Sequence, residues 1–136
     1  MKHLFAAGHK KTHRKTVTDA DVARFEAGLV HPVCSTFALA REMEWASRLF
    51  VLEMKDADEE GIGTMLQIDH KSPAFPGEEL EIVAEVTEQK GNSLTCAITV
   101  KAAGRLVATG FTGQKILKKE KLAGLLLAIK TQNGQR

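Results

Sequence analysis

The feature that most limits the fold is a long stretch, residues 37–55, that contains neither glycine nor proline. It is rich in Ala, Leu, Met and Glu, which favour helices, so we expect a helix of several turns there. Ser35 or Thr36 can cap its first turn, because their hydroxyl oxygens accept hydrogen bonds from the free amides at a helix start. On a helical wheel the apolar side chains lie nearly all round, so we expect the rest of the protein to enclose this helix.

The bulk properties exclude several classes of protein. The chain of 136 residues suits a single domain, residues 1–136, with its own core, and a formal net charge of +2 is too small to indicate nucleic acid binding. No apolar run approaches the roughly 18 residues of a membrane span, and the start is too short in apolar residues for a secretory signal. We therefore expect a cytoplasmic protein with no membrane partner, in which Cys34 and Cys96 are reduced thiols.

The residues before the long helix give weaker signals. Residues 1–14 are basic and rich in histidine, which predicts a solvated, poorly ordered arm, with a contact to a ligand phosphate as the alternative. Residues 15–18 favour a short strand. Thr18 or Asp19 then caps a brief helix, and Gly28 ends that segment.

After the long helix, alternating apolar side chains and tight turns dominate. The alternation predicts strands over residues 62–70, 80–88, 94–100 and 105–117. Pro-Gly, Gly-Asn and Ala-Gly pairs supply turns between them. A closing helix over residues 118–130 follows, with an apolar stripe along one side.

The first and last of these strands carry details that set the faces of the sheet. Gly110 and Gly113 interrupt the last strand and predict bulges there. In the first strand one face should carry alternate residues, namely Ile62, Thr64, Leu66, Ile68 and His70.

The order of elements indicates an α+β protein in which a curved antiparallel sheet wraps around the long helix. One main helix and about five strands leave sheet edges and one sheet face uncovered. We therefore expect a homodimer that extends the sheet.

Three side chains could carry chemistry, although the sequence has no phosphate loop, no metal-ligand spacing and no nucleophile motif. They are the hydroxyl of Thr36 at the helix start, the carboxylate of Glu44 and the imidazole of His70 at a strand end. Two helical turns, about 12 Å, separate Thr36 from Glu44, so a substrate lying along the helix start could touch both. The free amides there could also hold an oxyanion.

Each of these residues also has a purely structural explanation. Glu44 could pair with Arg48 one turn later on a narrow polar edge of the helix, Thr36 could serve as a cap, and His70 could be a surface residue. A nucleophilic pair of His31 and Cys34 is disfavoured, because Pro32 constrains how the two side chains can be placed.

The residues from 33 to 46 resemble a known family. Their sequence, Val33-Cys-Ser-Thr-Phe-Ala-Leu-Ala-Arg-Glu-Met-Glu-Trp-Ala46, is similar to the helix start of hotdog-fold thioesterases, and more narrowly of the fluoroacetyl-CoA thioesterase family. That family has a Thr near the helix start, then Met-Glu-Trp-Ala or a close variant, then a strand with Gly-Thr that ends in His, and a Pro-Gly turn. Gly63-Thr64, Asp69-His70 and Pro76-Gly77 match these features, and the resemblance runs from about residue 17 to residue 117.

The resemblance implies a hotdog fold and the hydrolysis of an acyl-CoA thioester to a free acid and CoA. It implies a catalytic trio of Thr36, Glu44 and His70. Glu44 would attack the thioester carbonyl or activate water, His70 would manage protons or polarise the site, and Thr36 would orient Glu44 or a substrate oxygen. It further implies no metal, no cofactor beyond the CoA of the substrate, and a homodimer with each site at the subunit interface, so that His70 can serve the partner's site.

The same resemblance implies which residues bind substrate, and the chain departs from the family's sequence pattern at one place, in its last strand. Ser35 at the helix start, with Gly63 and Thr64 on the strand, would bind substrate, Gly63 by leaving room for the acyl group. The family's last strand usually carries Gly-Thr-His-x-Arg, whereas this chain has Gly110-Phe-Thr-Gly-Gln-Lys115. Lys115 is expected to replace the missing Arg in part, although Lys cannot reproduce a bidentate contact.

Because the His and Arg are missing, fluoroacetyl specificity does not carry over, and the acyl group stays open. The basic residues 115–121 could meet CoA phosphates or form a solvated helix start. Two other functions fit the sequence: a hydratase or dehydratase of the same fold, and an acyl-CoA-binding module without turnover.

Overall fold

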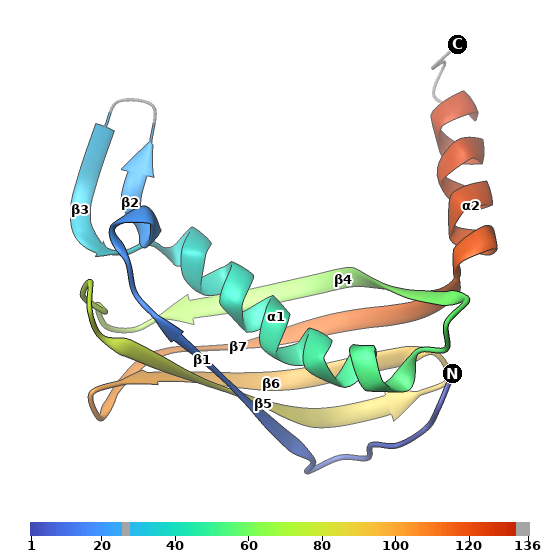
Figure 1. The fold of residues 1–136 in the computed structure, drawn as a ribbon, viewed down its shortest axis with the longest axis horizontal. Helices are drawn as coiled ribbons and strands as arrows, with labels where there is room; N and C mark the ends of the chain where they lie inside the picture. Colours follow the sequence, from blue (N-terminus) through green and yellow to red (C-terminus); the bar gives the residue numbers. More distant parts are fainter. Residues whose placement is uncertain (26–27, 133–136) are drawn as a thin grey trace.

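In the computed structural model, which describes residues 1–25 and 28–132, an antiparallel sheet of five strands curves around one long helix (Figure 1). The strand order in the sheet is β1-β5-β6-β7-β4. Its strands are β1 (Lys10–Thr16), β4 (Glu59–His70), β5 (Glu79–Lys90), β6 (Ser93–Ala102) and β7 (Arg105–Lys118). The helix α1 (Thr36–Met54) lies across the concave face of this sheet, which confirms the α+β arrangement expected from the sequence.

The helix α1 is capped by Ser35, whose side-chain oxygen accepts a hydrogen bond of 3.0 Å from the Ala38 amide. One side of the helix packs on the sheet and is completely buried; it includes Leu39, Met43, Ala46, Phe50 and Met54. The expectation that the helix is enclosed all round is wrong for this chain, because Phe37 is 82% exposed and Trp45 is 43% exposed. The second side of α1 therefore has no cover within a single chain.

Tight turns connect the last three strands, as predicted. Gly91 has φ +58° between β5 and β6, and Ala103 and Gly104 have φ +49° and +78° between β6 and β7. Positive φ at both central residues is typical of the hairpin turn that matches the twist of paired strands. The predicted inward side chains are buried, namely Leu80, Ile82, Ala84, Val86 and Cys96.

The basic residues near the N-terminus are not a loose arm. Residues 10–14 belong to β1, which pairs antiparallel with β5 at the edge of the sheet. Arg14 reaches Glu79 and Glu81 across that pairing, at 3.1 and 3.0 Å. The sequence did not predict residues 10–14 as a strand, because their side chains are charged or polar on both faces and show no apolar alternation. Such a composition protects an edge strand from pairing with other chains.

A small hairpin precedes α1, where the sequence predicted a brief helix up to Gly28. The helical part is a single 3-10 turn, η1 (Asp19–Asp21), in which Asp21 accepts a hydrogen bond of 2.8 Å from the Thr18 amide. The strands β2 (Val22–Phe25) and β3 (Gly28–Cys34) then form a separate two-stranded sheet. The predicted segment also included residues 26 and 27, which lie outside the described residues.

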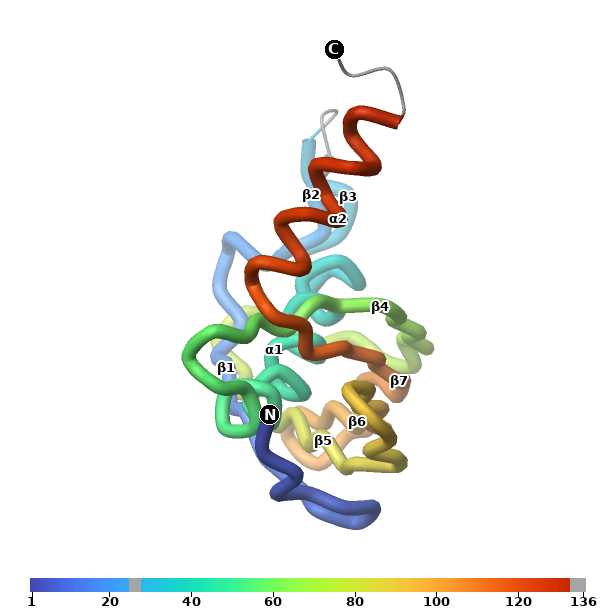
Figure 2. Tube along the Cα trace, turned by 90° about the vertical axis from the view of Figure 1, so that its right-hand side faces the viewer, coloured from blue at the N-terminus to red at the C-terminus, as the bar shows by residue number. Residues whose placement is uncertain are grey.

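The second helix, α2 (Lys119–Gln132), stands away from the body of the molecule. None of its described side chains is buried, and its apolar stripe, which includes Leu125 and Leu126, faces outward. The β2–β3 hairpin and α2 both rise on the β4 side of the sheet, at opposite ends (Figures 1 and 2). Neither helix among the described residues has the length and hydropathy of a membrane-spanning segment.

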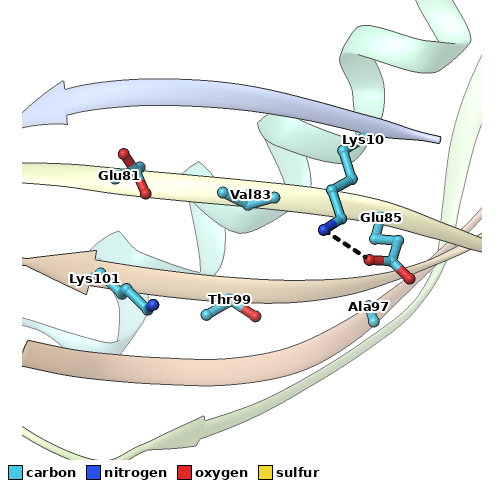
Figure 3. A pocket seen from close by; sticks show the side chains of 7 residues that line it. All are labelled: Lys10, Glu81, Val83, Glu85, Ala97, Thr99 and Lys101. Carbon is cyan, nitrogen blue, oxygen red and sulfur yellow. Dashed lines mark ion pairs between the residues drawn. The ribbon is translucent and has the colours of Figure 1, made fainter. Parts of the chain in front are cut away.

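The outer face of the sheet carries paired charges. A shallow hollow there is lined by side chains of β1, β5 and β6, and Lys10 and Glu85 form an ion pair of 3.5 Å across it (Figure 3). Surface pairs of this kind add little stability and mark a solvated face. The candidate chemistry therefore lies on the α1 side of the sheet.

Candidate functional site

Two glycines bring β4 close to α1. A Cβ atom at Gly61 would lie 2.4 Å from a methyl carbon of Val51, and one at Gly63 would lie 2.6 Å from the Oε1 atom of Glu44. Both positions therefore face the helix, and neither has room for a larger residue. The carboxylate of Glu44 occupies the space that a side chain at position 63 would otherwise fill.

A β-bulge directly follows Gly63 and changes which residues of β4 face the helix. Gly63 pairs with Gln114 of β7 and Met65 pairs with Gly113, so Thr64 is an extra residue between them. An extra residue shifts the alternation of side chains by one, and beyond the bulge Ile68 and His70 point toward α1.

The bulge corrects two sequence predictions. Ile62 and Thr64 do not share a face with His70, because the bulge lies between them. The sequence predicted bulges at Gly110 and Gly113 of β7. In the pairing of β4 with β7 the extra residue is instead Thr64 of β4, and β7 has its own irregularity at Val107, where it pairs with β6. Gly113 lies opposite the bulge, where a Cβ atom would come within 3.1 Å of the Thr64 hydroxyl oxygen.

Glu44 has an unpaired carboxylate. It lines a shallow hollow of about 280 Å³ together with four consecutive residues of β4, namely Gly63, Thr64, Met65 and Leu66. The alternative pairing with Arg48 is not formed, because Arg48 instead contacts Glu60 at 2.9 Å. Among the described residues, no hydrogen bond or ion pair involves the Glu44 carboxylate, so it is free to contact a substrate.

Thr36 and His70 form the second half of the candidate site. The Thr36 hydroxyl lies 2.9 Å from Nδ1 of His70, and Nε2 of that ring is buried with no partner among the described residues. Ser35 performs the capping, so the Thr36 hydroxyl is not needed for it. His70 is half-buried rather than a surface residue. A hollow of about 730 Å³ beside Thr36 separates the start of α1 from the β2–β3 hairpin.

The two halves lie apart within one chain. Thr36 and Glu44 are separated by two turns of α1, about 12 Å of helix rise. His70 contacts Thr36, while Gly63, seven residues earlier on β4, contacts Glu44. A single chain therefore brings together Thr36 and His70 but does not place Glu44 beside them.

Lys115 does not lie in the site of its own chain. Its side chain is exposed, and it alternates with Gln114, which is buried on the face toward α1. The Gln114 side-chain amide donates hydrogen bonds to the hydroxyl oxygen of Ser47, at 2.9 Å, and to the backbone oxygen of Glu44, at 3.4 Å. Sequence reasoning missed Gln114. The signal was its spacing, because Gln114 lies two residues from both Thr112 and Ile116, and alternate residues of a strand face the same side.

Neither cysteine has the character of a nucleophile. Burial raises the pKa of the Cys34 thiol to about 11, and burial also raises the pKa of the Cys96 thiol to about 12. The reactive species of cysteine is the thiolate, which such values disfavour near neutral pH. The His31–Cys34 pair is therefore excluded as a catalytic unit.

Comparison with known proteins agrees with this architecture. The family model of fluoroacetyl-CoA-specific thioesterases (FlK) matches residues 17–120. The Thermus thermophilus hypothetical protein TTHA0967, a thioesterase superfamily member, is 31% identical with a TM-score of 0.88, and the match covers 96% of each chain. A search of curated proteins gave no significant match.

Two thioesterases of stated substrate have the same fold at lower identity. The fluoroacetyl-CoA thioesterase FlK is 19% identical with a TM-score of 0.83, over 91% of this chain and 96% of that one. The 1,4-dihydroxy-2-naphthoyl-CoA thioesterase Slr0204 from Synechocystis is 18% identical with a TM-score of 0.65, over 82% and 84%. The predicted hotdog fold is confirmed, and the family match spans most of the sequence. The chain therefore belongs to the family of fluoroacetyl-CoA-specific thioesterases.

Proposed function

We propose that this chain hydrolyses acyl-CoA thioesters to a free acid and CoA, and that it works as a homodimer with each site shared between subunits. The observation that carries the proposal is the unpaired carboxylate of Glu44, which occupies the space left by the missing side chain of Gly63. A free carboxylate beside a hollow can act as a base or a nucleophile. Family membership makes a thioester the natural target.

In the proposed reaction Glu44 attacks the thioester carbonyl carbon, or removes a proton from the water that does. The amides of Thr36 and Phe37 at the start of α1 have no acceptor among the described residues and would stabilise the oxyanion. The carbon–sulfur bond then breaks, and His70 would deliver the proton that the CoA thiolate takes up. Where Glu44 is the nucleophile, this step leaves an acyl–Glu44 anhydride, which a water molecule hydrolyses to the free acid and the Glu44 carboxylate. Water supplies the hydroxyl group of the acid and the hydrogen of the thiol, so the atoms balance.

Two observations support a homodimer. β4 is the last strand of its sheet and has a pairing partner on one side only. Met65 and Leu66 on β4 are exposed apolar side chains, as is Trp45 on α1. A second copy pairing through β4 would cover the apolar side chains of that free edge.

The same pairing would complete the site. In an antiparallel self-pairing centred on Gln67, Leu66 would lie opposite the partner's Ile68 on the α1 side of the sheet. His70 would then lie opposite the partner's bulge at Thr64, directly beside Gly63. Glu44 of one chain would then face Thr36 and His70 of the other. Such a shared site resolves the separation of the two halves within one chain.

A cytoplasmic location is part of the proposal. Cys34 and Cys96 are both free, as in proteins of reducing compartments.

The test is a steady-state assay of free CoA release with short, aromatic and long acyl-CoA thioesters. Glu44→Gln should lower kcat by about 10²- to 10⁴-fold, because it removes the acid–base or nucleophilic group. Glu53→Gln is the matched control, since Glu53 is an exposed carboxylate on the same helix that pairs with Lys11. A rise in melting temperature with acyl-CoA but no release would indicate a binding module, and loss of enoyl absorbance without free thiol would indicate a hydratase.

A further inference from the structure

The inner face of β7 carries a buried amide beneath Glu44 that the proposed reaction does not use. Gln114 is 3% exposed, on a face otherwise filled by small or apolar side chains such as Ala108 and Ile116. Its amide nitrogen donates to the hydroxyl oxygen of Ser47 at 2.9 Å. That hydroxyl in turn donates to the backbone oxygen of Glu44 at 2.9 Å, and Ser47 is itself 1% exposed.

This amide is incompletely satisfied. Its Oε1 atom is buried and has no hydrogen-bond partner among the described residues. A buried acceptor without a donor lowers stability, and an apolar residue of similar size would avoid that cost. A buried polar group kept against this cost calls for an explanation, and a role in a neighbouring site is one.

The position of Gln114 connects it to both elements that hold Glu44. It is the Cα partner of Gly63, the residue over which the Glu44 carboxylate lies. Through Ser47 it also fixes the backbone of the helical turn that carries Glu44. β7 thus holds the main chain of Glu44, while β4 makes room for its side chain.

The charges around this cluster leave Glu44 unpaired. The two cations one helical turn from Glu44 have other partners, because Arg41 contacts Asp21 and Glu42 and Arg48 contacts Glu60. The side chain of Lys115 lies on the other face of the sheet from Gln114. A neutral amide can hold the helical turn without forming an ion pair with the carboxylate.

We propose that Gln114 is a positioning residue for thioester hydrolysis, acting through Ser47 to set the Glu44 carboxylate against the substrate carbonyl. The inference rests on the proposed function of Glu44. It predicts that the amide of Gln114 and the hydroxyl of Ser47 act as one unit.

The test compares Gln114→Leu, Ser47→Ala and the double variant, with CoA release measured well below each melting temperature. Each single variant should lower kcat by about tenfold to a hundredfold, because small displacements of a catalytic group cost that much, and KM should change less than about twofold. The double variant should be little worse than the worse single one, because both changes break one connection. Val86→Ala, buried on the same sheet with no polar contact, controls for lost stability.

An unchanged kcat in Gln114→Leu, an equal loss in Val86→Ala, or full additivity in the double variant would overturn the inference. If Gln114→Leu does not fold, Ser47→Ala alone decides, since it removes one buried oxygen and nothing else. Wild-type protein that releases no CoA from any substrate refutes the proposed function and this inference with it. Normal release that none of these variants impairs refutes the positioning role alone.

Discussion

The two ends of the candidate site on α1, at Thr36 and at Glu44, are built differently. At its start, Ser35 caps the helix and Thr36 contacts His70 at 2.9 Å, so the polar side chains there are paired within the chain. Two turns later, Glu44 projects from the helix with its carboxylate unpaired, while Gln114 engages its main chain from below. At the helix start the side chains of Thr36 and His70 contact each other, whereas the carboxylate of Glu44 is unpaired and only its main chain is held, by Gln114.

This difference indicates how the site would be divided. At the helix start, the Thr36 hydroxyl and Nδ1 of His70 contact each other, and Nε2 of the ring is without a partner among the described residues. The Glu44 carboxylate can attack or accept a proton, but no side chain among the described residues donates a hydrogen bond to it. Each end supplies what the other lacks, and the free edge of β4 provides a way to bring the two together across a dimer.

The largest expected effect comes from filling the space at the Glu44 end. Gly63→Ala places a methyl group where Oε1 of Glu44 now lies, 2.6 Å from the new atom, so the carboxylate must move. We expect CoA release to fall by about 10²-fold or more. Gly124→Ala, in open space on α2, is the control and should keep full activity. Full activity in Gly63→Ala would show that the carboxylate position does not matter.

The second-largest loss of CoA release is expected from a substitution that prevents β4 from pairing with a second chain. Leu66→Lys puts a charge on the exposed part of β4, which disfavours pairing with a second strand. We expect monomers by analytical ultracentrifugation and a parallel loss of CoA release. Leu127→Lys, on the exposed helix α2, is the matched surface control. A monomeric variant that retains wild-type activity would contradict the shared site.

Substitutions at the start of α1 should affect activity and stability separately, since Thr36 contacts His70 and Ser35 caps the helix. Thr36→Val removes the hydroxyl that contacts His70, and we expect about a tenfold loss of kcat with little change in melting temperature. Ser35→Ala removes the helix cap and should cost about 1 kcal/mol of unfolding free energy. Thermal denaturation and kinetics on both variants test the contrast, and equal effects on stability would remove it.

The smallest expected effect is on the reactivity of the buried Cys34 thiol, which lies just before the start of α1. Because burial raises the pKa of Cys34 to about 11, its thiolate forms only well above neutral pH. We expect native protein at pH 8 to react slowly with iodoacetamide, and denatured protein to react fast at both cysteines, as followed by mass spectrometry. Rapid labelling of native Cys34 would restore the rejected nucleophilic pair.

Most of the fold could be predicted, because its main signals are periodic. The absence of glycine and proline, together with residues that favour helices, predicted α1, and the strict alternation in β5 and β6 predicted their inward faces. β1 and the β2–β3 hairpin escaped prediction for a common reason. Their short strands carry few inward apolar side chains, and their order comes from pairing with segments distant in the sequence or across a turn.

The candidate site was less predictable, because it depends on one inserted residue. The bulge at Thr64 reverses which side chains of β4 face α1, and no local pattern marks it. Lys115 was chosen for its charge, whereas the direction of the strand places Gln114 under Glu44. The separation of Glu44 from His70 is likewise a matter of three-dimensional arrangement that sequence spacing does not reveal.

The most direct test of the shared site mixes two inactive variants, Glu44→Gln and His70→Ala, by co-expression. If the two residues of one site come from different chains, each heterodimer has one intact site, and random pairing should restore about a quarter of wild-type CoA release. Native mass spectrometry would confirm that heterodimers form. Heterodimers without recovered activity would contradict the account, because each site would then need Glu44 and His70 from the same chain.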